Sequence, residues 1–216
     1  MLKRRKISVA IGVLVLVGGC IQKETSHTVY LSPDGAVSWV VSEVNVKSDQ
    51  AEPGKRLAEE QDYIGPALLG SHGVARGLRV LGPIGTVRTT VVRDRRPFHL
   101  VTQADFPAID RLLSRFFREM GVRSTAAMLR DADRTTLRVR LDFATPVEER
   151  ETPVSELFDQ IEHLRFVLTE GRFNTADGLD VADGGVATLS PEWLDQAERA
   201  CEEKRVIEFV LTWSVD

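Results

Sequence analysis

Hydrophobic and polar residues alternate with a period of two along several segments of the chain. In the segment 135–143, Leu137, Val139 and Leu141 point to one side of a strand, while threonine and arginine side chains occupy the other. A strand with one apolar and one polar face is typical of an antiparallel sheet that packs on a core. The pattern predicts hairpins at 27–46, 85–103 and 124–143, and further strands at 163–173, 184–189 and 206–215.

The alternation changes phase inside the first predicted hairpin. Trp39 and Val41 follow one period of two, and the apolar set then moves by one residue to Val44. A shift by one residue turns every following side chain to the other face of a sheet unless an extra residue is inserted. We therefore expect a β-bulge near Ser42 and Glu43.

Apolar residues at three- and four-residue spacings predict helices between these strands. The clearest helix carries Ile109, Leu113 and Phe117 on one face and arginines on the other. Ser190 followed by Pro191 is a favourable helix start, with an N-cap hydroxyl and proline at the first helical position. The helices are expected at 50–64, at 67–81 after Gly65-Pro66, at 105–120, from Pro153, and at 191–204.

Hairpins that alternate with amphipathic helices predict an α+β fold. We expect an antiparallel sheet built from successive hairpins, with the helices packed mainly on one face. The chain has 216 residues, of which 43% are hydrophobic, so it is long and apolar enough to bury a core. Because no proline-rich or glycine/serine-rich linker divides residues 27–216, we expect them to form a single domain.

The first twenty residues have a different composition from the rest. Four basic residues at 3–6 precede a mostly apolar stretch of eleven residues at 7–17. This apolar run is shorter than the roughly 20 residues that cross a bilayer, and it has the length of a signal-peptide core. It ends in Gly18 and Gly19, which are followed directly by Cys20.

The motif Val17-Gly18-Gly19-Cys20 resembles the lipobox of bacterial lipoproteins, with valine where leucine is usual. The resemblance covers only residues 1–20. It implies that residues 1–19 are a signal peptide that is removed, that Cys20 carries the lipid, and that several acyl chains hold the protein in the cell envelope. Residues 20–26 would then be the lipidated cysteine and a short polar tether. The alternative is an uncleaved N-terminal anchor with an incidental cysteine.

The same resemblance bears on the membrane partner. By analogy with that class, Ile21 rather than aspartate after the cysteine favours the outer membrane in a cell with two membranes. Loss of residues 1–19 removes four basic residues and changes the formal net charge from −4 to −8. An acidic surface is repelled by anionic headgroups, so we expect the lipid on Cys20 to make the attachment. The charge also argues against a nucleic-acid partner.

The chain has two cysteines, so no intramolecular disulfide can form once Cys20 is acylated. Cys201 lies in the predicted helix at 191–204, where a small buried apolar residue is its simplest role. A reactive thiol is the lesser alternative, because the neighbouring Glu202 and Glu203 oppose formation of a thiolate.

Three aspartates offer the most site-like spacing in the chain. The carboxylates of Asp177, Asp180 and Asp183 are oxygen ligands of the kind that Ca²⁺ prefers. An EF-hand places its acidic groups at every second position, whereas here they are three residues apart. The Ala-Asp-Gly triplets at 176–178 and 182–184 are instead typical of tight turns. We predict two turns, keep a calcium site as the lesser alternative, and expect no metal or other cofactor.

The other candidate groups match no catalytic motif. The four histidines lack metal-ligand spacing, the glycines at 65–85 form neither a P-loop nor a dinucleotide fingerprint, and no GxSxG is present. A Ser/His/Asp triad assembled by the fold stays open. Exposed arginines at a turn (Arg93, Arg95, Arg96) and along a helix (Arg111, Arg115, Arg118) are compatible with anionic lipid or glycan, although a solvated face is the simpler interpretation.

These observations predict a lipid-anchored cell-envelope protein without catalytic activity. It would act as a structural or interaction module, with another envelope protein as its partner. The alternative is an envelope hydrolase or a small-ligand-binding lipoprotein with a pocket between helices and sheet. A concave pocket that gathers His72 or His99 with two carboxylates would favour the enzyme.

Overall fold

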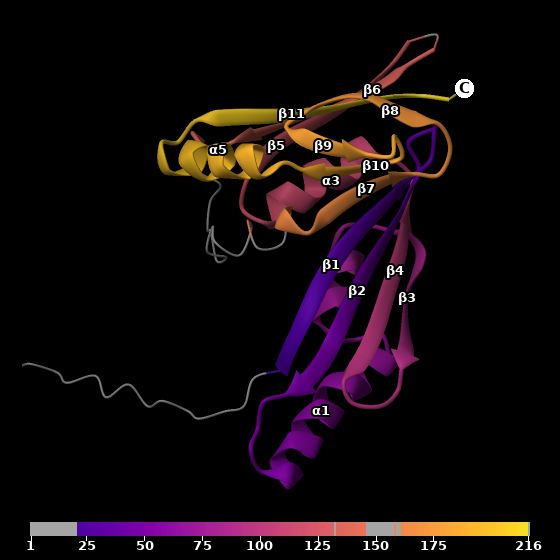
Figure 1. The fold of residues 1–216 in the computed structure, drawn as a ribbon, viewed down its shortest axis with the longest axis vertical. Coiled ribbons are helices and arrows are strands. Elements are labelled where there is room, and N and C mark those ends of the chain that lie inside the picture. Colours follow the sequence, from indigo (N-terminus) through magenta and orange to yellow (C-terminus); the bar gives the residue numbers. More distant parts are fainter. Residues whose placement is uncertain (1–20, 132, 146–157, 159–160, 216) are drawn as a thin grey trace, which may run out of the picture.

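The computed structural model describes residues 21–131, 133–145, 158 and 161–215. It contains two sheets, which Figure 1 shows meeting near the upper ends of β1 and β2. The larger sheet has seven strands in the order β3 (Ile84–Arg93), β4 (Phe98–Phe106), β2 (Val37–Ser48), β1 (Ile21–Leu31), β7 (Leu164–Leu168), β10 (Val186–Leu189) and β9 (Leu179–Ala182). The smaller sheet has the order β5 (Arg123–Arg130), β6 (Thr135–Asp142), β11 (Val206–Ser214) and β8 (Arg172–Asp177).

Four helices with described bounds cover these sheets. They are α1 (Pro53–Leu68), α2 (Gly73–Val80), α3 (Ile109–Glu119) and α5 (Pro191–Glu202). Helices α1 and α2 pack against β2, β3 and β4, whereas α3 packs on β5 and β6 and α5 packs on β11. None of the helices in the described ranges is both long enough and apolar enough to cross a membrane.

The molecule has an elongated part and a broader part (Figure 1). We call residues 21–106, which form β1 to β4 with α1 and α2, the arm. We call the described residues from 107 onward the head. Most buried apolar side chains of both parts belong to one continuous cluster, with Trp39, Phe116 and Phe166 among its largest members.

The predicted α+β class is confirmed, and the strands pair mostly as antiparallel hairpins. Two features differ from the prediction. The strands divide into two sheets rather than one, and β7 returns beside β1 in the parallel direction. The alternating pattern of each strand is the same in either arrangement, so the local sequence does not choose between them.

The boundary between the first two helices was predicted in the wrong place. Helix α1 continues through Pro66 to Leu68, and the break falls at residues 69–72. The residue before a proline usually avoids helical dihedral angles because its Cβ clashes with the proline ring. Gly65 has no Cβ, so the helix can continue. The helix predicted to begin near Pro153 lies largely outside the described residues.

The polar tether predicted at residues 20–26 is also corrected. Residues 21–26 are the first half of β1, where Ile21 is paired with Ser48 and Ser26 with Ser42 of β2. Polar side chains are accommodated there because this half of β1 has β2 on one side only, while β7 joins β1 from His27 onward. Cys20 lies outside the described residues, one residue before this strand.

Candidate functional site

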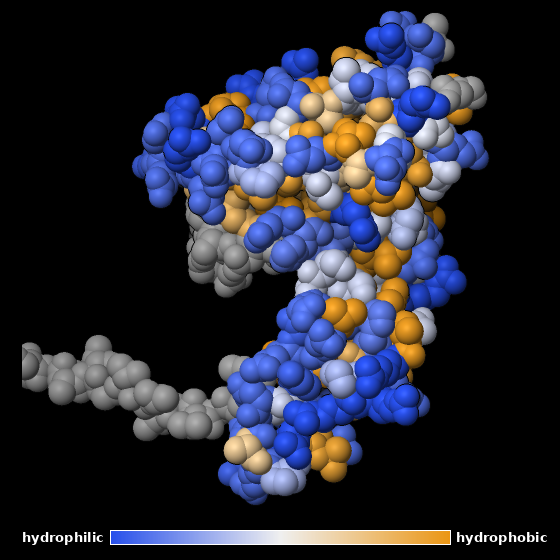
Figure 2. Space-filling model, in the orientation of Figure 1, coloured by the Kyte–Doolittle hydropathy of each residue, from blue (hydrophilic) through white to orange (hydrophobic). Residues whose placement is uncertain are grey.

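A groove of about 1020 Å³ lies where the arm meets the head. Figure 2 shows the surface hollowed between these two parts. Buried side chains form its inner wall, and exposed polar side chains lie at its rim. The wall includes Trp39, Val41, Leu78, Leu81 and Phe116, and the rim includes Lys23, Glu24, Ser26, Glu119 and His163.

Beside the groove, strand β2 brings a carboxylate into the apolar core. Glu43 continues the alternation of Val37, Trp39 and Val41, so its side chain points inward and is completely buried. The register with β4 then shifts between Glu43 and Val46, and Asn45 adopts a positive φ of 56°. The predicted bulge near Ser42 and Glu43 is therefore present just after Glu43.

Three side chains surround the Glu43 carboxylate. The Tyr63 hydroxyl donates a hydrogen bond to Oε1 at 2.6 Å, the Lys23 ammonium contacts the same oxygen, and His72 Nε2 lies 3.3 Å from Oε2. Burial alone raises the pKa of a carboxyl group, but the hydrogen bonds from His72, Lys23 and Tyr63 outweigh burial and lower the pKa of Glu43 to about 2. Glu43 is therefore ionised inside the protein.

Lys23 connects this buried cluster to the groove. Its ammonium donates to the Tyr63 hydroxyl at 2.6 Å, lies 5.1 Å from the centre of the Tyr63 ring, and also lines the groove rim. Burial and the bond to the Glu43 carboxylate raise the pKa of Tyr63, so its phenol stays protonated and continues to donate. The cluster thus holds a cation at the edge of an otherwise apolar wall.

The His72 arrangement does not match a catalytic triad. In a triad, one ring nitrogen faces the nucleophile and the other faces the acid. Here Glu43 and the Thr102 hydroxyl, at 3.4 Å, both approach Nε2. Nδ1 of His72 has no hydrogen-bond partner in the described part of the chain. Thr102 is also fully buried, so a substrate could not reach its hydroxyl.

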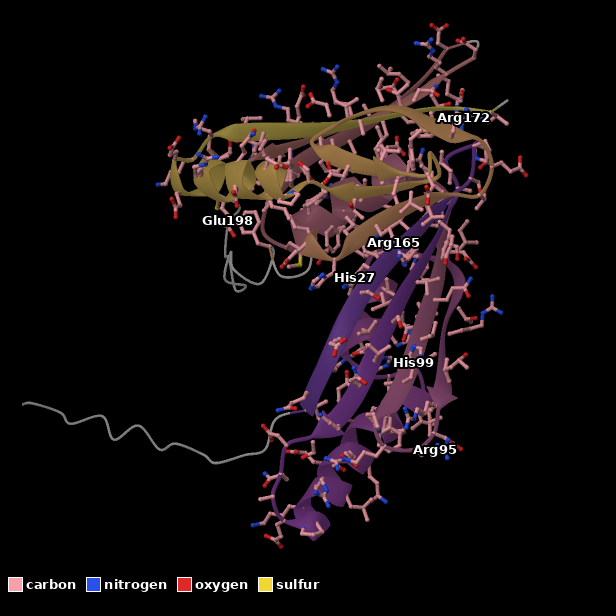
Figure 3. The ribbon with its side chains drawn as sticks, in the orientation of Figure 1. His27, Arg95, His99, Arg165, Arg172 and Glu198 are labelled. Atoms are coloured by element: carbon pink, nitrogen blue, oxygen red, sulfur yellow. The ribbon has the colours of Figure 1, made fainter. Side chains whose placement is uncertain are left out.

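A second histidine pairs with a serine on the opposite face of the same sheet. His99 Nε2 lies 2.9 Å from the Ser42 hydroxyl. Because Ser42 precedes Glu43 in a strand, the two side chains point to opposite faces. The Ser42–His99 pair is therefore separated from the groove by the sheet itself. Figure 3 shows His99 on the arm, well below His27.

His27 lies at the inner end of the groove, where β1 approaches the head (Figure 3). Its backbone N–H donates to the carbonyl of His163 at 3.1 Å, and its ring meets Trp39 edge-on at 5.9 Å. Burial lowers the pKa of His27 to about 4, with Glu43 opposing this shift and His163 and Lys23 adding to it. The ring is therefore neutral near pH 7.

Two polar atoms of groove-lining side chains are buried without a bond. His27 Nδ1 and Trp39 Nε1 have no hydrogen-bond partner among the residues that the structure describes. A buried polar group of this kind costs free energy unless water or a ligand satisfies it. The indole N–H is a donor only, so it would satisfy an oxygen acceptor on a bound molecule.

Of the three aspartates considered as calcium ligands, Asp183 lies in a turn and the other two lie in strands. Asp177 ends β8 and Asp180 lies in β9, and both are exposed. Asp183 opens the turn between β9 and β10 with a positive φ of 51°. The predicted turns are present at Gly178 and at 183–185. Within the described ranges, no group of three histidine, cysteine, aspartate or glutamate side chains is placed to hold a metal ion.

Of the remaining candidate residues, Cys20 lies outside the described part of the chain, so its lipidation stays a prediction. Cys201 is a free, half-buried residue that packs against the core. Arg96 is not simply solvated, because its Nε donates to Glu60 at 2.8 Å and its Nη2 to the Ser48 carbonyl at 2.9 Å.

No motif in the sequence identifies Glu43, Lys23 and Trp39 as parts of one site. One signal was present in the sequence, since Glu43 occupies an inward position in the alternation that starts at Val37. A charged residue in such a position needs a buried partner. Tyr63 could not be assigned as that partner, because it comes from a different element.

Comparison with known proteins adds one structural likeness. No family model and no curated protein matches this sequence. The solved structure of the folded domain of LppM from Mycobacterium tuberculosis aligns over 90% of this chain and 91% of that chain, with 14% identity and a TM-score of 0.37. A likeness at this level assigns neither a fold family nor a function to this chain.

Proposed function

We propose that this chain is a lipid-anchored cell-envelope protein that binds a small amphiphile, with a hydrocarbon part and an oxygen acceptor, in the groove and does not transform it. The observation that carries this proposal is the groove itself, about 1020 Å³ with an inner wall of aromatic and aliphatic side chains. Ligand sites of a few hundred to a thousand cubic ångströms with apolar walls and few polar groups are typical of small-molecule binding.

The polar atoms of the groove suggest the chemistry of the ligand. Trp39 Nε1 and His27 Nδ1 lie among the apolar side chains, and Lys23 is held at the rim by Glu43. An amphiphile with an oxygen acceptor would satisfy these groups while its hydrocarbon covers the wall. The proposal keeps the non-catalytic role predicted from the sequence and makes a small molecule, rather than another envelope protein, the main partner.

The hydrolase alternative has less support. It required a pocket that gathers His72 or His99 with two carboxylates. Among the described carboxylates, His72 approaches that of Glu43, and the Thr102 hydroxyl lies near the same ring nitrogen, while His99 lies across the sheet. The groove histidines are His27, which is neutral, and the exposed His163.

Filling the groove tests the proposal. Gly77 lies in α2 on the groove wall, and a Cβ at this position meets open space. Gly77→Leu would place a side chain in the groove and also favour the helix. The leucine side chain would occupy space that the ligand needs, so we expect photolabelling of the membrane-bound protein by a diazirine-bearing long-chain alcohol to fall at least about fivefold, which corresponds to about 1 kcal/mol.

Gly54→Leu is the matched control. Gly54 lies in the exposed first turn of α1, outside the groove, and its Cβ also meets open space. We expect this variant to be labelled like the parent, with the label on peptides that contain Val74 or Met120. Equal labelling of the two variants, or label confined to other peptides, would contradict binding in the groove.

The anchor is part of the same proposal. The lipid would be attached to Cys20, which immediately precedes β1, and the outer membrane is the placement that Ile21 favours in a cell with two membranes. Separation of inner from outer membranes by density tests that placement, because the protein would be recovered with the denser outer-membrane fraction.

A further inference from the structure

The free end of the arm gathers three segments that are distant in sequence. Ile21, the first described residue, pairs with Ser48 at the end of β2. The Ser48 carbonyl accepts a hydrogen bond from Arg96 in the β3–β4 turn, and the Ser48 N–H donates to Glu60 of α1 at 3.0 Å. The chain start, this turn and α1 therefore share one end of the arm.

Helix α1 projects beyond this end of the sheet. Glu60 bonds at the level of Ser48, whereas Tyr63 bonds further inward at Glu43. The helix therefore runs inward from Glu60, and its seven preceding residues extend outward by about 10 Å at 1.5 Å per residue. Figure 1 shows the start of α1 as the lowest part of the arm.

The proposed lipid site is joined directly to the described part of the arm. Ile21, the residue that follows Cys20 in the sequence, is the first residue of β1. Since residues 21–26 are paired in β1, no tether separates Cys20 from the folded arm. Acyl chains on Cys20 would bring this end of the arm, and not the head, to the bilayer surface.

The end of the arm exposes basic side chains that can bind an anionic headgroup layer, and it also exposes the acidic Glu52 and Asp94. Arg93 and Arg95 are exposed at the β3–β4 turn, and Figure 3 shows Arg95 near the lower end of the arm. Two apolar side chains are also exposed there, Val92 at 58% and Leu57 at 56%. Guanidinium groups bind phosphate with paired hydrogen bonds, and aliphatic side chains enter the interfacial region.

We propose that the free end of the arm docks on a bilayer that contains anionic lipids, with Arg93 and Arg95 on the headgroup phosphates and Leu57 in the interface. We identify the partner as a bilayer because the proposed lipid-bearing residue, Cys20, is joined directly to Ile21 at this end of the arm. The net charge of −8 argues against adsorption of the whole surface, but headgroups within a Debye length respond to the charges nearest to them. This inference rests on the lipid anchor of the proposed function and is independent of groove binding.

Depth-dependent quenching tests this orientation. A fluorophore is placed at Leu57→Cys or, as the matched control, at Leu129→Cys, in a Cys201→Ser background of the full lipidated chain. Leu129 is likewise an exposed leucine, at 65%, but it lies in strand β5 of the head rather than in helix α1. In vesicles of phosphatidylcholine and phosphatidylglycerol with a nitroxide-bearing lipid, we expect the label at position 57 to be strongly quenched and the label at position 129 to be unquenched.

Charge reversal tests the role of the arginines. Arg93→Glu with Arg95→Glu should reduce quenching at position 57 at least about twofold, since each basic residue near an anionic surface adds to the attraction. Arg138→Glu with Arg140→Glu, exposed arginines at the same spacing on β6, should leave it unchanged. Quenching at position 129 equal to that at 57, or no effect of the first pair, would overturn the proposal. Absence of the proposed lipid anchor would give a different result from a wrong orientation, because the protein would then not float with the vesicles.

Discussion

The buried carboxylate of Glu43 links the stability of the arm to the polar contacts beside the groove. Glu43 is fully buried and ionised, and Tyr63, Lys23 and His72 compensate its charge. Loss of one partner from a buried charged group usually costs several kcal/mol because the other charge stays desolvated. The cluster therefore ties β1, β2, α1 and the residue before α2 together at the groove.

His27 makes the stability of the folded chain depend on pH. Its pKa is lowered by burial from 6.5 to about 4, so the unfolded chain takes up a proton first as the pH falls. The contribution of neutral His27 to the free energy of unfolding is fully present above pH 6.5 and is lost as the pH falls towards 4. A shift of this size corresponds to about 3 kcal/mol. We expect the free energy of unfolding, measured in urea, to decline across this window.

The variant His27→Phe keeps a ring against Trp39 but does not titrate, so its decline between pH 6.5 and 4 should be smaller by about that amount. His163→Gln is the comparison variant, because His163 is a smaller cause of the His27 shift than burial, so its removal should change the decline only slightly. A profile in His27→Phe identical to that of the parent would contradict the assignment to His27.

The sequence alone predicted only part of this site. Glu43 could be placed on the inward face of β2 from the alternation alone, and the bulge after it from the phase change. Its partners could not be found, because Lys23, Tyr63 and His72 come from three other segments. Spacing rules describe neighbours within one element, whereas these contacts join elements 20 or more residues apart.

At the scale of elements, the β8–β9 connection is shaped by a distant helix. Gly178 has a positive φ of 79°, and a Cβ built there would lie 2.4 Å from Cδ1 of Trp193. Trp193 lies in the first turn of α5, where its N–H donates to Ser190 Oγ at 3.2 Å and its indole donates to the Glu208 carbonyl at 2.8 Å. The turn and the helix are therefore packed against each other.

Gly178→Ala should destabilise the protein through both strain and contact. A non-glycine residue at positive φ costs about 1–2 kcal/mol, and the clash with Trp193 should add about 1–3 kcal/mol. Gly184→Ala separates the two effects, because Gly184 has a similar φ of 71° but its Cβ would lie 3.5 Å from the nearest atom. Urea unfolding should show the larger loss for Gly178→Ala, and equal losses would contradict the contact.

The Asp-Gly pairs predicted these turns, and the Ser-Pro pair predicted the start of α5. Such local signals succeed because they depend on the dihedral angles and hydrogen bonds of adjacent residues. The break between α1 and α2 was misplaced at Gly65-Pro66, because one local signal, proline, was overridden by another, the missing Cβ of glycine.

At the scale of the whole molecule, the position of the chain start decides how the protein meets a membrane. The proposed lipid on Cys20 would leave directly from the end of the arm, and the groove lies further along the same strand, β1. The head, with its four-stranded sheet, is joined at the other end of the arm (Figure 1).

Replacement of the proposed lipid site tests this arrangement. Cys20→Ala removes the sulfur that would carry the lipid, and with a net charge of −8 little else holds the mature chain to anionic membranes. We expect cell fractionation to show much less protein in the membrane pellet. Cys201→Ala is the matched control and should stay membrane-bound. A Cys20→Ala variant that sediments like the parent would contradict the lipobox assignment.

The sequence by itself determined the local features of this protein: the hairpins, most helices, the bulge in β2, the turns at the aspartates and the lipobox resemblance. These follow from interactions between residues close together in the chain. Only the tertiary structure decided that the strands form two sheets, that residues 21–26 belong to β1, and that Glu43, Lys23, Tyr63 and His72 meet beside an apolar groove. Alternation specifies which face of a strand is buried but not which distant element covers it, and that choice is made by packing over the whole core.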